Sequence, residues 1–285
     1  MNSSQDSPAT DLDPSFVFDF RSYDEPDADN QRWSTWYDVE PLCRGPEPRP
    51  DWVITDRAAV DTELGILKTG KEADVFLLER AVDGGASVVM AAKRYRDATH
   101  RSFHRNAVYT EGRRGRDSRE ARAAAKGTAF GRAVAAGQWA SAEWESLKRC
   151  WLAGISVPYP VQIDGTELLM EWITHDGETA PRLAQCRPSP ALLRSYFDQV
   201  RETLALMAQD GIVHGDLSAY NILVAGERLV VIDLPQVLDL VGNPLGMDFL
   251  LRDCANVCAW FRSKGLDPAV ADENALFSDV LATAF

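Results

Sequence analysis

The chain has 285 residues, 45% of them hydrophobic and 26% charged, so it can bury a full core in one large or two modest domains. Its formal net charge of -13 argues against general affinity for nucleic acid. The five cysteines lack close pairing, no apolar run approaches the roughly 18 residues of a transmembrane helix, and the first residues do not read as a secretory signal. These features predict a cytoplasmic protein that does not enter a membrane.

Residues 1–50 differ in composition from the rest of the chain. They hold eleven acidic residues, four basic residues and seven of the fifteen prolines, without a sustained hydrophobic period. This composition predicts a disordered acidic extension. The extension also carries aromatic residues, which are Phe16, Phe18, Phe20, Trp33, Trp36 and Tyr37. They leave open whether it is a plain flexible tail or docks on a partner or on the protein's own surface.

Short strand-like runs follow the extension. Residues 64–68, 73–79 and 87–94 predict three strands, with the turn Asp83-Gly-Gly before the third. The loop Lys68-Thr-Gly-Lys-Glu-Ala-Asp74 joins the first two strands, and its backbone amides are suited to covering phosphates. A P-loop NTPase is not expected, because Glu72 stands where a Ser or Thr must bind magnesium.

A basic insert occupies residues 94–132, with eleven basic and four acidic residues. Three interpretations stay open: a clamp on RNA phosphates, a cover over a bound nucleotide, or a solvated helix. Aromatic residues are sparse in the insert, so sequence-specific reading of nucleic acid is not expected.

The next elements alternate between helix and strand. Residues 138–153 predict a helix with Glu143 on its apolar face and Glu145 on the opposite side. The apolar run 168–173 predicts a strand, and the polar segment 174–189 predicts a connector between two lobes.

Helices dominate the remainder of the chain. Ser189-Pro190 is typical of a helix start, and Asp210-Gly211 of its end. Residues 249–264 and 273–284 predict two more helices.

The strongest chemical signal is His214-Gly-Asp216-Leu-Ser-Ala-Tyr-Asn221, followed by Ile232-Asp233. Asp216 and Asn221 have the spacing of the catalytic loop of protein kinases, and Asp233 ends an apolar run as a second carboxylate. Phosphoryl transfer from ATP needs a group that orients the nucleophile and oxygen ligands for Mg²⁺. The pattern therefore predicts that Asp216 positions the nucleophile and that Asn221 and Asp233 bind magnesium.

Lys93 ends the third predicted strand, where a kinase places its phosphate-binding lysine, and Glu143 is its predicted partner. Together with the catalytic loop, these residues predict an α+β, two-lobed protein-kinase-like fold. Residues 51–173, with the insert, would form an antiparallel N-terminal lobe with one main helix. Residues 174–285 would form a mostly helical C-terminal lobe.

The segments Thr69-Gly-Lys-Glu-Ala73 and His214-Gly-Asp-Leu-Ser-Ala-Tyr-Asn-Ile-Leu223, with Ile232-Asp233, resemble the signatures of the RIO family of atypical protein kinases. The likeness runs from about residue 64 to 265, and the chain looks closest to the branch without an N-terminal winged helix. Ala219 departs from a frequent Glu of the family, outside the predicted chemistry.

This resemblance implies that ATP binds between the lobes. Backbone groups near Glu171 and Ile173 would read the adenine, and Lys93 with Glu143 would orient the phosphates. The implied nucleotide loop contains Thr69, Lys71 and Glu72. The family also implies phosphorylation of Asp233 and a link to the maturation of ribosomal precursors, so a protein or ribonucleoprotein partner would bind the basic insert or the acidic extension.

Features of conventional kinases are missing. Gly215 replaces the arginine of H-R-D, Asp233-Leu-Pro replaces D-F-G, and no A-P-E follows. The short interval from Asp233 to Asp253 leaves little room for an activation segment and a peptide-docking region. ATP hydrolysis, autophosphorylation or a restricted Ser/Thr substrate is therefore expected.

Two alternatives remain at this stage. Aminoglycoside and choline kinases share the H-G-D-x-x-x-x-N loop, although a bacterial antibiotic kinase would commonly carry His at the position of Ser218. A nucleotide-sensing binding module, in which turnover is incidental, is the other alternative.

Overall fold

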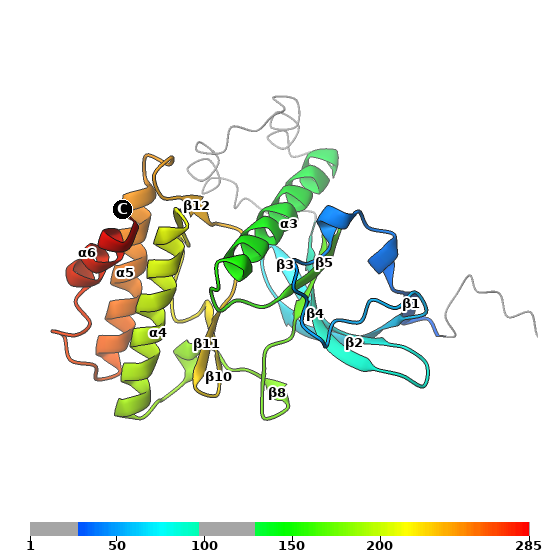
Figure 1. The fold of residues 1–285 in the computed structure, drawn as a ribbon, viewed down its shortest axis with the longest axis horizontal. Helices are drawn as coiled ribbons and strands as arrows, with labels where there is room; N and C mark the ends of the chain where they lie inside the picture. Colours follow the sequence, from blue (N-terminus) through cyan, green and yellow to red (C-terminus); the bar gives the residue numbers. More distant parts are fainter. Residues whose placement is uncertain (1–27, 97–128, 285) are drawn as a thin grey trace, which may run out of the picture.

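A six-stranded antiparallel sheet forms the N-terminal lobe, in the order β1-β2-β3-β4-β6-β5 (Figure 1). Its strands are β1 (Gln31–Trp33), β2 (Val60–Thr69), β3 (Ala73–Ala81), β4 (Ser87–Tyr95), β5 (Pro160–Asp164) and β6 (Glu167–Glu171). The computed structural model describes residues 28–96 and 129–284. The predictions made for residues 1–27 and for most of the basic insert lie outside the described residues. The three strands expected before the insert are confirmed as β2, β3 and β4.

Residues 28–50, which we expected to belong to a disordered extension, instead pack on this sheet, so docking on the protein's own surface, one of the alternatives left open for the aromatic residues, holds for this part. Strand β1 pairs with the start of β2, and two short 3₁₀ helices follow, η1 (Thr35–Tyr37) and η2 (Pro41–Cys43). The Trp36 side chain is only 2% exposed and lies in a cluster with Leu78, Met90 and Tyr159. The average composition of the segment does not reveal this contact, because burying one tryptophan stabilises the packing more than many exposed polar neighbours oppose it.

The long helix α3 (Ala129–Leu152) covers the sheet next to β4, β5 and β6 (Figure 1). It begins within the expected basic insert, nine residues before the predicted start at position 138. Its apolar face buries Trp144 and Leu147, whereas the Glu145 side chain is 68% exposed, as its helical position predicted.

Three helices build the C-terminal lobe: α4 (Pro190–Gln209), α5 (Gly246–Ser263) and α6 (Glu273–Ala284). The hydroxyl of Ser189 caps α4 by accepting from the Leu192 N–H, and Pro190 occupies the first helical position as predicted. Helix α6 packs against both α4 and α5. Within the described ranges, no helix has the length and apolar character that crossing a membrane requires.

Short paired strands connect the lobes and carry the loops of the C-terminal lobe. They are β7 (Thr174–His175) with β8 (Glu178–Thr179), β9 (Ile212–Val213) with β12 (Leu238–Asp239), and β10 (Ile222–Ala225) with β11 (Arg228–Val231). A further 3₁₀ helix, η3 (Leu183–Gln185), precedes α4. The predicted catalytic loop therefore lies between β9 and β10, and Asp233 follows β11.

Candidate active site

Lys93 joins three distant parts of the chain. It lies near the end of β4, and its Nζ donates to Glu143 Oε1 on α3 at 2.7 Å and to Asp233 Oδ1 at 3.0 Å. The Lys93 side chain is 13% exposed, that of Glu143 2% and that of Asp233 51%. Burial alone would lower the pKa of Lys93, but the nearby carboxylates of Glu143 and Asp233 raise that pKa well above its ordinary value. Lys93 is therefore a fixed cation at the junction of the lobes.

Asp216 and Asn221 meet within the catalytic loop. The Asn221 side chain is buried, and its Nδ2 donates to the backbone carbonyl of Asp216 at 2.9 Å, which leaves Oδ1 available for a ligand. Asp216 itself is exposed. The amide of Asn221 thus fixes the loop, and the Asp216 carboxylate remains accessible to a substrate.

Strands β10 and β11 bring Asp233 next to the catalytic loop. The Ile232 N–H donates to the Asn221 carbonyl at 2.9 Å, and His214 Nε2 lies 3.3 Å from the Ile232 carbonyl. His214 Nδ1 accepts from the Asp216 N–H at 3.3 Å, which fits a neutral ring with its proton on Nε2. Burial lowers the pKa of His214, so this ring stays neutral and joins the two loops without adding charge.

Asp233 has an unusual backbone conformation, with φ of 67°. Left-handed conformations are uncommon outside glycine, although Asp adopts them more readily than most residues, as Asp176 does in the turn between β7 and β8. The pKa of Asp233 is lowered chiefly by Lys93. Asp233 is consequently a charged, accessible carboxylate in a left-handed turn.

The oxygen donors of this site fit Mg²⁺. The Asp233 carboxylate and the free Oδ1 of Asn221 are hard ligands, and magnesium is typically held by one or two such groups together with phosphate oxygens and water. No cluster of three or more His, Cys, Asp or Glu side chains suited to a metal occurs among residues 28–96 and 129–284. Asn221 and Asp233 would hold Mg²⁺ together with phosphate oxygens and water.

Asp253, on α5, anchors the catalytic loop and was not assigned a role from the sequence. It is fully buried, and its two oxygens accept from the N–H groups of Gly215 and Leu217, both at 2.8 Å. Burial raises its pKa to about 7, against the two N–H bonds and the charge of Arg252. Arg252 donates to the Gly215 carbonyl. A carboxylate on the apolar face of a predicted helix, the signal used for Glu143, would have revealed Asp253.

The turn between β2 and β3 carries Thr69, Lys71 and Glu72, all of which are exposed. At Gly70 an added Cβ would come within 2.8 Å of the Ala73 carbonyl, so the tight turn requires glycine. None of the three exposed side chains contacts the catalytic loop in the described part of the chain, and their role toward phosphates stays a prediction.

Lys68, at the end of β2, is a further basic residue of the site that was not among the predicted ones. Its pKa is lowered by burial first and then by the charges of Arg182 and Lys93, while Asp233 acts in the opposite direction. The end of β2 therefore lies close enough to Lys93 and Asp233 for their charges to act on the pKa of Lys68. Lys68 and Arg182 thus add positive potential where phosphates would bind.

Glu171 and Ile173 lie where the chain passes from β6 to the C-terminal lobe. The Glu171 N–H donates to the Tyr159 carbonyl at 2.9 Å, and the Ile173 carbonyl accepts from the Ala180 N–H at 3.0 Å. Among the described residues, no hydrogen bond engages the Ile173 N–H. The Ile173 N–H is therefore a group left for an adenine ring, and the role of Glu171 and Ile173 toward adenine also stays a prediction.

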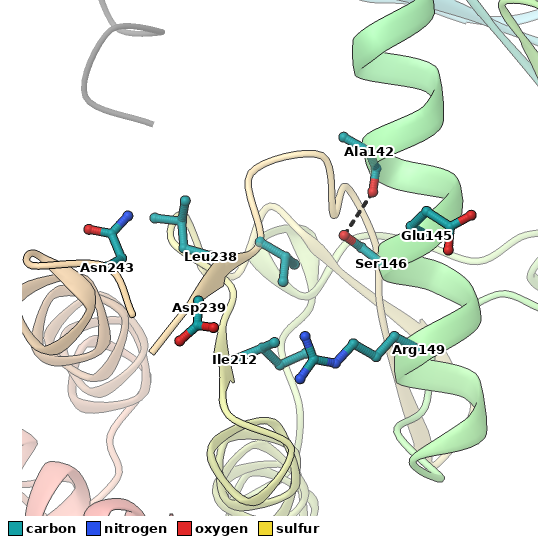
Figure 2. Close-up of a pocket in the computed structure, with 9 residues that line it drawn as sticks. Ala142, Glu145, Ser146, Arg149, Ile212, Leu238, Asp239 and Asn243 are labelled. Carbon is teal, nitrogen blue, oxygen red and sulfur yellow. Dashed lines mark hydrogen bonds between the residues drawn. The ribbon is translucent and has the colours of Figure 1, made fainter. Parts of the chain in front are cut away.

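A cavity of about 250 Å³ lies away from these residues, between α3 and the segment that follows Asp233 (Figure 2). Ala142, Ser146 and Arg149 line it from α3, and Leu238 and Asp239 line it from β12. None of the predicted catalytic residues borders it. We therefore locate the active site by the convergence of Lys93, Asn221 and Asp233 rather than by this cavity.

Comparisons with known proteins agree with this geometry. A family model of the RIO domain matches residues 80–276. The RIO-type serine/threonine-protein kinase Rio1 of Haloferax volcanii is 34% identical over 221 residues, which are 78% of this chain and 69% of that protein. Rio1 of Methanocaldococcus jannaschii is 30% identical over 205 residues, 72% of this chain and 64% of that protein.

A solved structure shows the same fold. The crystal structure of the Rio2 kinase from Chaetomium thermophilum superimposes with a TM-score of 0.51 at 19% sequence identity, over 78% of this chain and 63% of that one. The two-lobed, protein-kinase-like α+β architecture predicted from the sequence is thereby confirmed. Because the family model covers most of the chain and the Haloferax volcanii protein matches it at this identity, the chain belongs to the RIO family of atypical serine/threonine kinases.

Proposed function

We propose that this chain is a magnesium-dependent kinase that transfers the γ-phosphoryl group of ATP to a Ser or Thr hydroxyl, to its own Asp233 or to water. The observation that carries the proposal is the bridge made by Lys93, whose Nζ contacts both Glu143 and Asp233. A fixed cation between a buried counter-ion and an accessible metal-binding carboxylate is the arrangement that phosphoryl transfer requires.

The residues divide the reaction between them. Lys93 would exchange its bond with Asp233 for the phosphates, while Glu143 keeps it in place. Bound through Asn221 and Asp233, Mg²⁺ would neutralise charge on the phosphates. When the acceptor is a hydroxyl or water, Asp216 would orient the attacking oxygen and accept its proton as the new P–O bond forms and the bond to ADP breaks. The Asp233 carboxylate carries no proton, so its attack would need no base.

The acceptor is proposed to be restricted. Residues 234–245 alone connect Asp233 to α5, and β12 within them pairs with β9. The described chain thus has no extended segment after Asp233 on which a long peptide would lie. This geometry favours water, Asp233 itself or a compact protein substrate over extended peptides.

Location and partners are further proposals. We place the protein in the cytoplasm, a proposal supported by its five free cysteines. A protein or ribonucleoprotein partner would bind through the insert at residues 94–132, which carries eleven basic residues, or through the acidic N-terminal residues.

The family assignment favours a RIO-type kinase over the two alternatives, an aminoglycoside or choline kinase and a pure binding module.

Magnesium-dependent ATP turnover of the purified chain tests the proposal. Asp216→Asn should lower turnover by roughly 100-fold or more, because the attacking oxygen loses its proton acceptor. Asp198→Asn is a matched control, since Asp198 is an exposed aspartate of α4 that pairs with Arg194. Wild-type protein without magnesium-dependent turnover, or an Asp216→Asn variant as active as the control, would refute the proposal.

A further inference from the structure

Tyr95 lies two residues after Lys93 on β4, so both side chains point to the face of the sheet that α3 covers. The tyrosine is 6% exposed. Its hydroxyl donates to Glu143 Oε2, while Lys93 donates to Oε1 of the same carboxylate. Lys93 Nζ also lies 5.2 Å from the centre of the Tyr95 ring. Tyr95 therefore contacts both members of the phosphate-orienting pair.

The hydroxyl satisfies an oxygen that has no access to water. Glu143 is 2% exposed, and leaving one oxygen of a buried carboxylate without a donor is costly. Burial and then the Glu143 carboxylate raise the pKa of Tyr95 well above its ordinary value, so the phenol keeps its proton and remains a donor. With one donor on each oxygen, the carboxylate has a single orientation.

Helix α3 is packed more closely on its sheet side than on the side toward the C-terminal lobe, where Arg149 pairs with Asp210 beside a cavity. One side contacts β4, β5 and β6, but Ala142, Ser146 and Arg149 on the side toward the C-terminal lobe border the 250 Å³ cavity (Figure 2). A cavity offers no partner atoms and so contributes no dispersion energy. The orientation of the Glu143 carboxylate is therefore set by its two bonds to the sheet, from Lys93 and from Tyr95.

We propose that Tyr95 is a positioning residue of the kinase, which orients the Glu143 carboxylate so that Lys93 is held for the nucleotide phosphates. Without the hydroxyl, Glu143 holds Lys93 less firmly. Lys93 then spends more of its time bonded to Asp233, which competes with the nucleotide phosphates for it. The inference rests on the proposed ATP-dependent phosphoryl transfer.

Tyr95→Phe removes one oxygen and keeps the ring. We expect the KM for ATP to rise roughly tenfold, the range for a lost hydrogen bond to a charged group, with a smaller change in kcat. A purely structural loss would instead reduce the active fraction, which lowers the apparent kcat and leaves KM unchanged. An unchanged KM in Tyr95→Phe would overturn the proposal.

Tyr196→Phe is the matched control. Tyr196 is 1% exposed, and its hydroxyl donates to the Gly226 carbonyl at 2.6 Å in the C-terminal lobe, away from Glu143. The control variant should lose stability but keep the KM for ATP. An equal rise in KM in both variants would show that any buried hydroxyl has this effect, which contradicts a specific role for Tyr95.

A double-mutant cycle with Glu143→Ala tests whether Tyr95 acts through Glu143. The Tyr95→Phe effect on KM should largely vanish in the Glu143→Ala background, and a full effect there would contradict the proposal. Unfolding free energies of the same four proteins give a second cycle that needs no turnover. A wild-type chain without turnover would refute the proposed function, whereas additive unfolding energies would refute the Tyr95–Glu143 coupling.

Discussion

Two aspartates of the active site, Asp253 and Asp233, lie in opposite environments. Asp253 is buried beneath the catalytic loop, and its two oxygens are occupied by backbone N–H groups. Asp233 is half exposed and forms an ion pair with Lys93. Burial raises the pKa of Asp253 to about 7, while Lys93 lowers that of Asp233. One aspartate fixes backbone geometry, and the other remains charged and available to a ligand.

The largest expected effect comes from neutralising the exposed aspartate. Asp233→Asn should lower magnesium-dependent ATP turnover by roughly 100-fold or more, because the metal loses its carboxylate ligand. Any phosphoenzyme that is labile to hydroxylamine, as an acyl phosphate is, should disappear as well. Radiolabelled ATP and a turnover assay measure both effects.

Asp239→Asn is the matched control for that experiment. Asp239 is an exposed aspartate on β12, only six positions further along the chain, and its Oδ1 accepts from the N–H groups of Val241 and Gly242. Its turnover should stay close to that of the wild type. A label that survives hydroxylamine would instead indicate Ser, Thr or Tyr as the acceptor.

A smaller effect is expected from the buried aspartate. Asp253→Asn keeps one oxygen but turns an NH₂ group toward one of the two N–H donors, so a hydrogen bond to the catalytic loop is lost. We expect kcat to fall roughly 10-fold, with little change in the KM for ATP, because the loop positions the nucleophile rather than the nucleotide. A change confined to KM would contradict this division of roles.

The smallest effect concerns the dependence of stability on pH. The pKa of Asp253 is raised in the folded state, so its contribution to stability is fully present below its unfolded value of about 4 and is lost as pH rises through about 7. The free energy of unfolding of the wild type relative to Asp253→Asn should therefore decline across this window. Urea titrations at a series of pH values measure this difference in unfolding free energy. A difference that grows with pH would contradict a raised pKa for Asp253.

Local spacing made much of the site predictable. Asp216, Asn221 and Asp233 occur within one short stretch, and Lys93 and Glu143 could be placed by strand position and helical period. Asp253 and Tyr95 escaped because their partners are distant in sequence: the Asp253 bonds reach Gly215 and Leu217, and Tyr95 reaches Glu143. Period-two alternation along β4 would have placed Tyr95 beside Lys93.

The prediction for residues 28–50 failed for a different reason. Composition describes an average over a segment, whereas docking depends on a few side chains and on the strand edge they meet. Trp33 pairs with Val60 at the edge of β2, and Trp36 enters the core of the sheet, with Arg44 and Arg49 over its ring. The acidic, proline-rich composition carries no information about such an edge.

The pairing of β12 with β9 has a consequence for regulation. Asp239 pairs with Ile212 and Leu238 with Val213, so the chain that leaves Asp233 returns at once to the strand that precedes the catalytic loop. Conventional kinases place at this point a long segment whose ordering switches the enzyme on. Here the segment that follows Asp233 is paired with the strand that precedes the catalytic loop, so occupancy by nucleotide and partner, rather than a mobile loop, would set when the enzyme acts.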